Sequence, residues 1–159
     1  MPDHGQLPSI CVVICCHNSE TRIATTLRHL AEQQVPSELI WEILIIDNAS
    51  TDGTVQAVER FSAQHRELSV RVVSEPQLGN GYARQRGIRE AGLDCMLFVD
   101  DDNWLAPNYL KLLAETLGEH PEVEALGGMS IAECEGPAPS WLARYQGWYA
   151  VTGPGDGTA

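Results

Sequence analysis

The amino-acid sequence predicts an α/β domain with a mostly parallel sheet. Short apolar runs of strand length alternate with stretches in which apolar residues recur at helical spacing. This alternation is typical of parallel strands joined by crossover helices. A chain of 159 residues, 43% of them hydrophobic and 20% charged, is large enough for one domain with its own core.

Five apolar runs are expected to form strands. The first, second and fourth are nearly continuous, which is typical of strands buried on both faces of a parallel sheet. The third alternates with polar residues, so we expect it nearer an edge. Gly127 and Gly128 interrupt the fifth. In chain order, the runs cover residues 10–16, 41–46, 68–73, 95–99 and 123–131.

Four helices are expected between these strands. Asn18 and Ser19 are good N-cap residues for the first helix, and segment 50–52 offers one for the second. The third helix is placed at residues 82–91, and Pro107 suits the first turn of the fourth. The core-facing residues of the first, second and fourth helices are Ile23, Leu27 and Leu30; Val55, Val58 and Phe61; and Leu110, Leu113 and Leu117.

The alternating pattern ends after Ile131. Residues 132–159 form an aromatic and glycine-rich segment instead. We expect residues 1–159 to be a single domain with an α/β core at 1–131. The segment at 132–159 is expected to lead into a part beyond the carboxyl end, so the chain would be the front of a longer protein.

Net charge and cysteine content indicate where the protein is located and which classes of partner it binds. A net charge of −12 without any basic run argues against nucleic-acid binding. The amino terminus lacks the features of a signal peptide, and no apolar stretch is long enough to cross a membrane. Five cysteines, mostly in or beside apolar runs, are typical of free thiols. We expect a cytoplasmic protein without a transmembrane segment, and peripheral membrane association stays open.

Polar side chains follow three of the expected strands. Because the carboxyl ends of parallel neighbours meet at one edge of a sheet, these sets are expected to converge there. They are His17, Asn18 and Glu20; Asp47, Asn48 and Asp52; and Asp100, Asp101 and Asp102.

The last set is called here the acidic cluster. Adjacent carboxylates repel one another, and a divalent cation such as Mg²⁺ or Mn²⁺ would hold them together. The alternative is a solvated acidic turn in which Asp102 or Asn103 caps the next helix.

The polar sets have the chemistry of a site for a nucleoside diphosphate and a metal. Asp47 can accept a hydrogen bond from a base N–H, and Arg84 and Arg86 can neutralise phosphate oxygens. The turn at 79–81 can bring backbone N–H groups close to a ligand. The alternatives are helix caps and a solvated arginine face, and His17 is expected to shape the pocket.

Four segments, in order, resemble motifs of the family 2 glycosyltransferases. VVICCHNSE resembles the opening strand and Asn turn, ILIIDNASTDGT the second-strand motif, GNGYARQRGI the Gly…Ala-Arg segment, and LFVDDDNWLAPNYL the D-x-D motif. The resemblance implies a GT-A fold, which is a Rossmann-like α/β/α sandwich. It also implies transfer of a sugar from a nucleotide-sugar donor, usually with inversion, to a carbohydrate or lipid-linked acceptor.

The resemblance also implies roles for individual residues. Asp47 would bind the base, expected to be uracil, and Asp102 would be the principal ligand of Mn²⁺ or Mg²⁺, with Asp100 facing the ribose or the metal. Arg84 would contact the base or the phosphates. The implied nucleotide-sugar-binding set is Cys16, Asn18, Glu20, Asp47, Asn48, Arg84, Asp100 and Asp101.

The sequence departs from the family pattern at several positions. Asn48 stands where a second Asp is common, which leaves the base and sugar preference open. No residue matches the carboxylate that serves as general base in the family, because Glu133 and Glu135 stand in the wrong place. The alternative to an active transferase is therefore a GT-A module that binds a nucleotide or a partner chain without catalysis.

Overall fold

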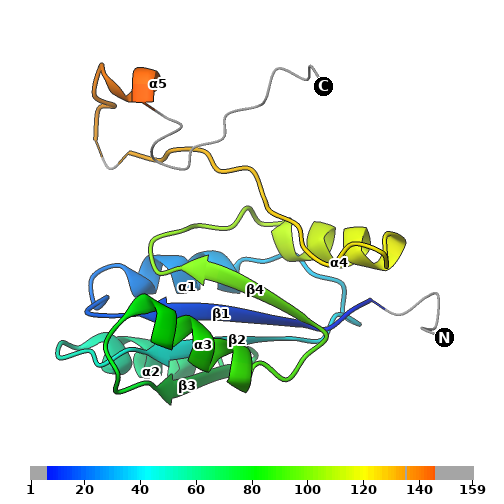
Figure 1. Cartoon of the computed structure of the whole chain (residues 1–159), viewed down its shortest axis with the longest axis horizontal. Coiled ribbons are helices and arrows are strands. Elements are labelled where there is room, and N and C mark those ends of the chain that lie inside the picture. Colours follow the sequence, from blue (N-terminus) through cyan, green and yellow to red (C-terminus); the bar gives the residue numbers. More distant parts are fainter. Residues whose placement is uncertain (1–6, 135, 146–159) are drawn as a thin grey trace. The chain divides into compact units, whose positions relative to one another are not determined.

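The structure is a computed structural model that describes residues 7–134 and 136–145 (Figure 1). The chain forms two compact units, residues 1–121 and 122–159, each of which is described by itself. No helix among the described residues is long and apolar enough to cross a membrane.

The first unit is built on a four-stranded parallel sheet in the order β3-β2-β1-β4. The continuous apolar runs place β1 and β2 in the centre, where Ile10–Ile14 and Ile43–Ile46 are buried. The alternating run forms an edge, as expected. The strands are β1 (Ile10–Cys16), β2 (Trp41–Asp47), β3 (Val70–Ser74) and β4 (Cys95–Asp100).

Helices cover both faces of this sheet. Helices α1 (Ile23–Ala31), α2 (Thr54–Gln64) and α4 (Tyr109–Glu119) bury their apolar sides in the core cluster on one face. Helix α3 (Asn80–Glu90) packs on the opposite face, in front of the sheet in Figure 1. It approaches closely because Gly87 has no side chain: a Cβ there would lie 2.6 Å from Cγ1 of Val13.

Two predictions about strands need correction. The run that begins at Cys95 forms a strand, β4, as predicted, but it lies at an edge of the sheet and is not buried on both faces, because Val99 is its only buried residue. Residues 123–131 form no strand, and Met129 and Ile131 are exposed. A strand needs a hydrogen-bonded neighbour, and the two glycines lower the strand propensity of this segment further. The regular element of the second unit's described residues is the short helix α5 (Leu142–Tyr145).

The predicted N-cap of the first helix was also wrong. Helix α1 begins at Ile23 after Arg22, and no side chain caps it. Asn18 instead adopts a left-handed backbone conformation with φ of 51° and binds another loop. For α2 the N-cap residue is Gly53, outside the predicted segment 50–52, so that prediction was wrong by one residue. Asp52, which precedes Gly53, still accepts the backbone N–H of Thr54 through its Oδ1 at 3.0 Å.

Candidate functional site

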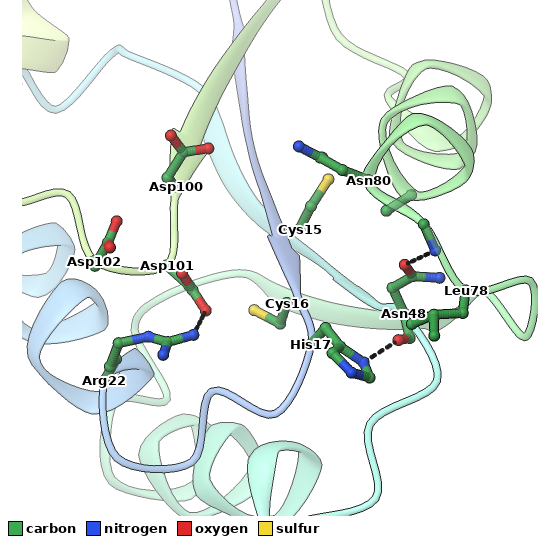
Figure 2. Close-up of a pocket in the computed structure, with 12 residues that line it drawn as sticks. Cys15, Cys16, His17, Arg22, Asn48, Leu78, Asn80, Asp100, Asp101 and Asp102 are labelled. Carbon is green, nitrogen blue, oxygen red and sulfur yellow. Dashed lines mark hydrogen bonds and ion pairs between the residues drawn. The ribbon is translucent and has the colours of Figure 1, made fainter. Parts of the chain in front are cut away.

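A hollow of about 500 Å³ opens at the carboxyl edge of the sheet. The register places Cys16 of β1 opposite Asp47 of β2, and Cys15 opposite Asp100 of β4, so the three polar sets converge as expected. Figure 2 shows the acidic cluster on one side of the hollow and Asn48 and Leu78 on the other. The lining residues are Cys15, Cys16, His17, Arg22, Asn48, Leu78, Gly79, Asn80, Ala83, Asp100, Asp101 and Asp102.

The middle acid of the cluster is anchored to the protein. The Asp101 carboxylate accepts hydrogen bonds from the Ser19 hydroxyl and from Arg22 Nη2, the latter at 2.8 Å. Its backbone carbonyl accepts the Thr26 hydroxyl at 2.8 Å. The Asp101 hydrogen bond raises the pKa of Arg22. These contacts fix the end of β4 against the start of α1 and leave the carboxylate of Asp101 largely engaged.

The outer acids have different surroundings. Arg84 Nη2 lies 3.2 Å from Asp100 Oδ1, and the Arg84 guanidinium stacks over Phe98, 4.7 Å from the ring centroid. Arg84 Nε also donates to Asn80 Oδ1 at 3.3 Å. Asp102 is exposed and makes no hydrogen bond or ion pair with the described residues. Of the three acids, Asp102 is therefore the one without a side-chain partner among the described residues, while Asp100 is exposed and shares its carboxylate with Arg84.

Asp47 carries a buried oxygen without a partner. The residue is 8% exposed, and no described group donates a hydrogen bond to its Oδ1. Burying an acceptor without a hydrogen bond costs about 1–3 kcal/mol, and the large majority of buried polar atoms in proteins therefore have a partner. Asp47 is the last residue of β2, opposite Cys16 in the register, and it is not itself among the residues that line the hollow. It therefore suits an incoming N–H donor.

Two of the predicted residues are turned toward the loop before α2. Asn18 Oδ1 accepts the Thr51 N–H at 2.8 Å, and Glu20 Oε2 accepts the Gly53 N–H at 3.1 Å. Neither side chain lines the hollow. Both hold the two loops that follow β1 and β2 together, which keeps the carboxyl edge of the sheet in one arrangement.

The floor of the hollow carries no thiolate. Burial raises the pKa of the Cys15 and Cys16 thiols, so both stay protonated near neutral pH. His17 Nδ1 lies 2.8 Å from the backbone oxygen of Asn48, which can only accept, so the ring donates from Nδ1. His17 shapes the pocket wall, as predicted.

The acidic cluster fits a cation that is shared with a substrate. Among the described residues, no group of three or more His, Cys, Asp or Glu side chains is arranged to hold a metal ion. Mg²⁺ and Mn²⁺ bound with phosphate substrates need only one or two protein carboxylates, because phosphate oxygens and water complete the coordination shell. Asp102 and Asp100 supply that number of carboxylates at the edge of the hollow.

Sequence reasoning missed the lining residue Arg22, and it considered Asn80 only as part of the turn at 79–81 and not for its side chain. Arg22 lies in the loop after β1, and Asn80 is the first residue of α3, after the loop that follows β3. Because Arg22 is a cation near three acids, charge complementarity could have identified it. Arg86, considered for phosphate binding, instead pairs with Glu90 at 2.9 Å on α3.

Residues 11–151 match the family model described as Glycosyl transferase family 2. The chain belongs to this family. It is 25% identical over 118 residues to the putative glycosyltransferase EpsH of Bacillus subtilis, covering 74% of this chain and 33% of EpsH. It is 32% identical over 109 residues to the poly(ribitol-phosphate) β-N-acetylglucosaminyltransferase TarS of Staphylococcus aureus, covering 69% of this chain and 19% of TarS. The chain thus spans at most a third of the length of these relatives.

Solved structures agree with this assignment. TarS residues 1–349 in complex with UDP superimpose with a TM-score of 0.65 at 27% identity, covering 79% of this chain and 38% of that chain. The mannosyltransferase PcManGT of Pyrobaculum calidifontis, in complex with GDP-Man and Mn²⁺, gives 0.65 at 27% identity, covering 84% and 38%. The family 2 membership and the GT-A fold implied by the sequence motifs are therefore confirmed.

Proposed function

We propose that the protein transfers a sugar from a nucleoside diphosphate sugar, a UDP-sugar by preference, to a carbohydrate or lipid-linked acceptor with inversion. The hollow at the carboxyl edge of the sheet would hold the donor. Some family members are named as transferases, and structural neighbours were solved with UDP, UDP-GlcNAc or GDP-Man. Both findings favour sugar transfer over nucleotide binding without catalysis.

The buried, unpartnered Oδ1 of Asp47 is the observation that carries this proposal. Uracil presents an imino N–H at N3, and guanine presents an N–H at N1. Cytosine presents a lone pair at N3 and donates only from its exocyclic N4, so a carboxylate aligned with N3 of uracil would face the lone pair of cytosine. The site is therefore expected to accept UDP, to accept GDP if the larger ring fits, and to bind CDP more weakly.

The acidic cluster would serve the diphosphate end of the donor. Asp102 and Asp100 would hold Mn²⁺ or Mg²⁺, which supplies Lewis-acid stabilisation of the departing diphosphate. Arg84 lies close enough to Asp100 to add a positive charge there. Asp101 would keep its two neighbours in place through Ser19 and Arg22.

The transfer step itself follows from inversion. The acceptor oxygen attacks the anomeric carbon on the side opposite the diphosphate, and the bond from that carbon to the diphosphate oxygen breaks. A base takes the proton of the acceptor hydroxyl. We assign no base: Glu133 lies in the second unit, and Glu135 lies outside the described residues.

Base selectivity tests the proposal. Calorimetric titration of UDP, GDP and CDP with Mn²⁺ should show tighter binding of UDP than of CDP. Asp47→Asn should weaken UDP binding about 10- to 100-fold, because a hydrogen bond to a charged acceptor contributes about 1.5–3 kcal/mol. Equal binding of UDP and CDP, unchanged by Asp47→Asn, would refute the role of Asp47.

A further inference from the structure

Asn48 has a side chain whose polar atoms are all engaged within the protein. The residue is 3% exposed and follows the last residue of β2. Its Nδ2 donates to the backbone oxygens of Glu75 and Gln77 at 3.1 and 2.7 Å. Its Oδ1 accepts the backbone N–H of Gly79 at 2.8 Å. One amide thus spans the whole segment 75–79.

The backbone of Asn48 joins the same segment to the central strand. Its N–H donates to the carbonyl of Cys16 at 2.8 Å, and its own carbonyl accepts from His17 Nδ1 (Figure 2). Asn48 therefore ties together the end of β1, the end of β2 and the loop that leads to α3.

The end of segment 75–79 forms one wall of the hollow. Leu78 and Gly79 line it, and Asn80, the first residue of α3, lines it directly afterwards. Gly79 has φ of 140°, a conformation that favours glycine, so the segment turns there into the helix. Any shift of this segment changes the width of the hollow opposite the acidic cluster.

We propose that Asn48 is a positioning residue that sets the wall of the donor site, acting through its two amide N–H donors and not through contact with the donor. This inference rests on the proposed function. It replaces the expectation from the sequence motifs that Asn48 belongs to the nucleotide-sugar-binding set.

The Asn48→Asp variant separates the two roles because it preserves shape. The variant keeps an acceptor for the Gly79 N–H but replaces the NH2 group, with both of its donors, by one oxygen that faces the carbonyls of Glu75 and Gln77. A buried anion beside two carbonyl oxygens is unfavourable, so the segment should move away. If Asn48 instead served the ligand as an acceptor, the carboxylate of the variant would keep that role, and binding would be unchanged or tighter.

UDP titration with Mn²⁺ at about pH 8 is the first measurement. Asn48→Asp should raise the Kd roughly tenfold or more, because two buried hydrogen bonds are lost. The matched control is Asn108→Asp, which adds the same charge at an exposed residue. Asn108 is the N-cap residue of α4, and its side chain makes no capping hydrogen bond. At about pH 5.5 the ratio of variant to wild-type Kd should shrink, because protonation of the introduced carboxyl restores one donor.

Amide hydrogen exchange of Gly79 tests the positioning role without nucleotide. In the wild type, Asn48 Oδ1 protects this amide, and protection should fall in both Asn48→Ala and Asn48→Asp. Wild-type protection in both variants, or wild-type UDP affinity in Asn48→Asp, would overturn the inference. If the wild type binds no UDP, the proposed function fails, and the exchange of Gly79 still decides whether Asn48 positions the wall.

Discussion

The anchoring of Asp101 predicts that the middle acid of the cluster contributes to stability. Asp101→Ala removes the acceptor of the Ser19 hydroxyl, which is fully buried, and the ion pair with Arg22. A hydrogen bond to a charged acceptor contributes about 1.5–3 kcal/mol, and we assign at most about 1 kcal/mol to Arg22, whose side chain is 49% exposed. We expect a loss of about 2–3 kcal/mol and a Tm lower by roughly 6–12 °C.

Thermal unfolding followed by circular dichroism measures this loss. The matched control is Asp102→Ala, one residue further on, because Asp102 is exposed and makes no hydrogen bond or ion pair with the described residues. Its Tm should stay within about 1 °C of the wild type, as is usual for surface substitutions. Equal Tm values for the Asp101 and Asp102 variants would refute the anchoring role.

Three further predictions concern charge and packing around the sheet. Arg84→Gln should raise Mn²⁺ affinity without nucleotide about two- to fivefold, because it removes the cation that competes for the acidic cluster, while UDP binding weakens. The Arg71 guanidinium lowers the pKa of Glu42 below its usual 4.5, so the stability from this pair is complete above that pH and is lost as pH falls through the lower folded-state pKa. Gly87→Ala should destabilise the protein by about 1–2 kcal/mol through overpacking, whereas Gly118→Ala, which has open space around it, should not.

Each of these has a direct measurement and a contradicting result. Metal titration tests Arg84→Gln, and an unchanged Mn²⁺ affinity would contradict competition. Acid unfolding compares the wild type with Arg71→Gln, and a stability difference that persists at the lowest pH would contradict the Glu42 linkage. Urea unfolding compares the glycine variants, and equal stabilities would mean that α3 does not pack on the sheet at Gly87.

Much of the fold follows from local pattern. The continuous apolar runs at 10–16 and 41–46 became the central strands almost residue for residue, because a strand buried on both faces needs apolar side chains throughout. The run at 95–99 has the same pattern and became an edge. Which strand lies at an edge depends on pairing across the sheet, and hydropathy does not record pairing.

The site was predictable to the level of strand ends and no further. Asp47 and the acidic cluster stand where apolar runs stop, so their convergence follows from parallel pairing. The roles of Glu20 and Asn48 could not be predicted in this way. Their partners, Gly53 and segment 75–79, lie about 30 residues away in the chain. No local motif encodes such contacts.

The most direct test of the account is calorimetric titration of UDP with and without Mn²⁺, for the wild type and Asp102→Ala. We predict binding that requires the metal and that Asp102→Ala weakens at least about tenfold, as expected for loss of an essential metal ligand. Two results would contradict a metal-assisted donor site at this edge of the sheet. One is UDP binding that is independent of Mn²⁺ and unchanged by Asp102→Ala, and the other is no binding of UDP or GDP under any of these conditions.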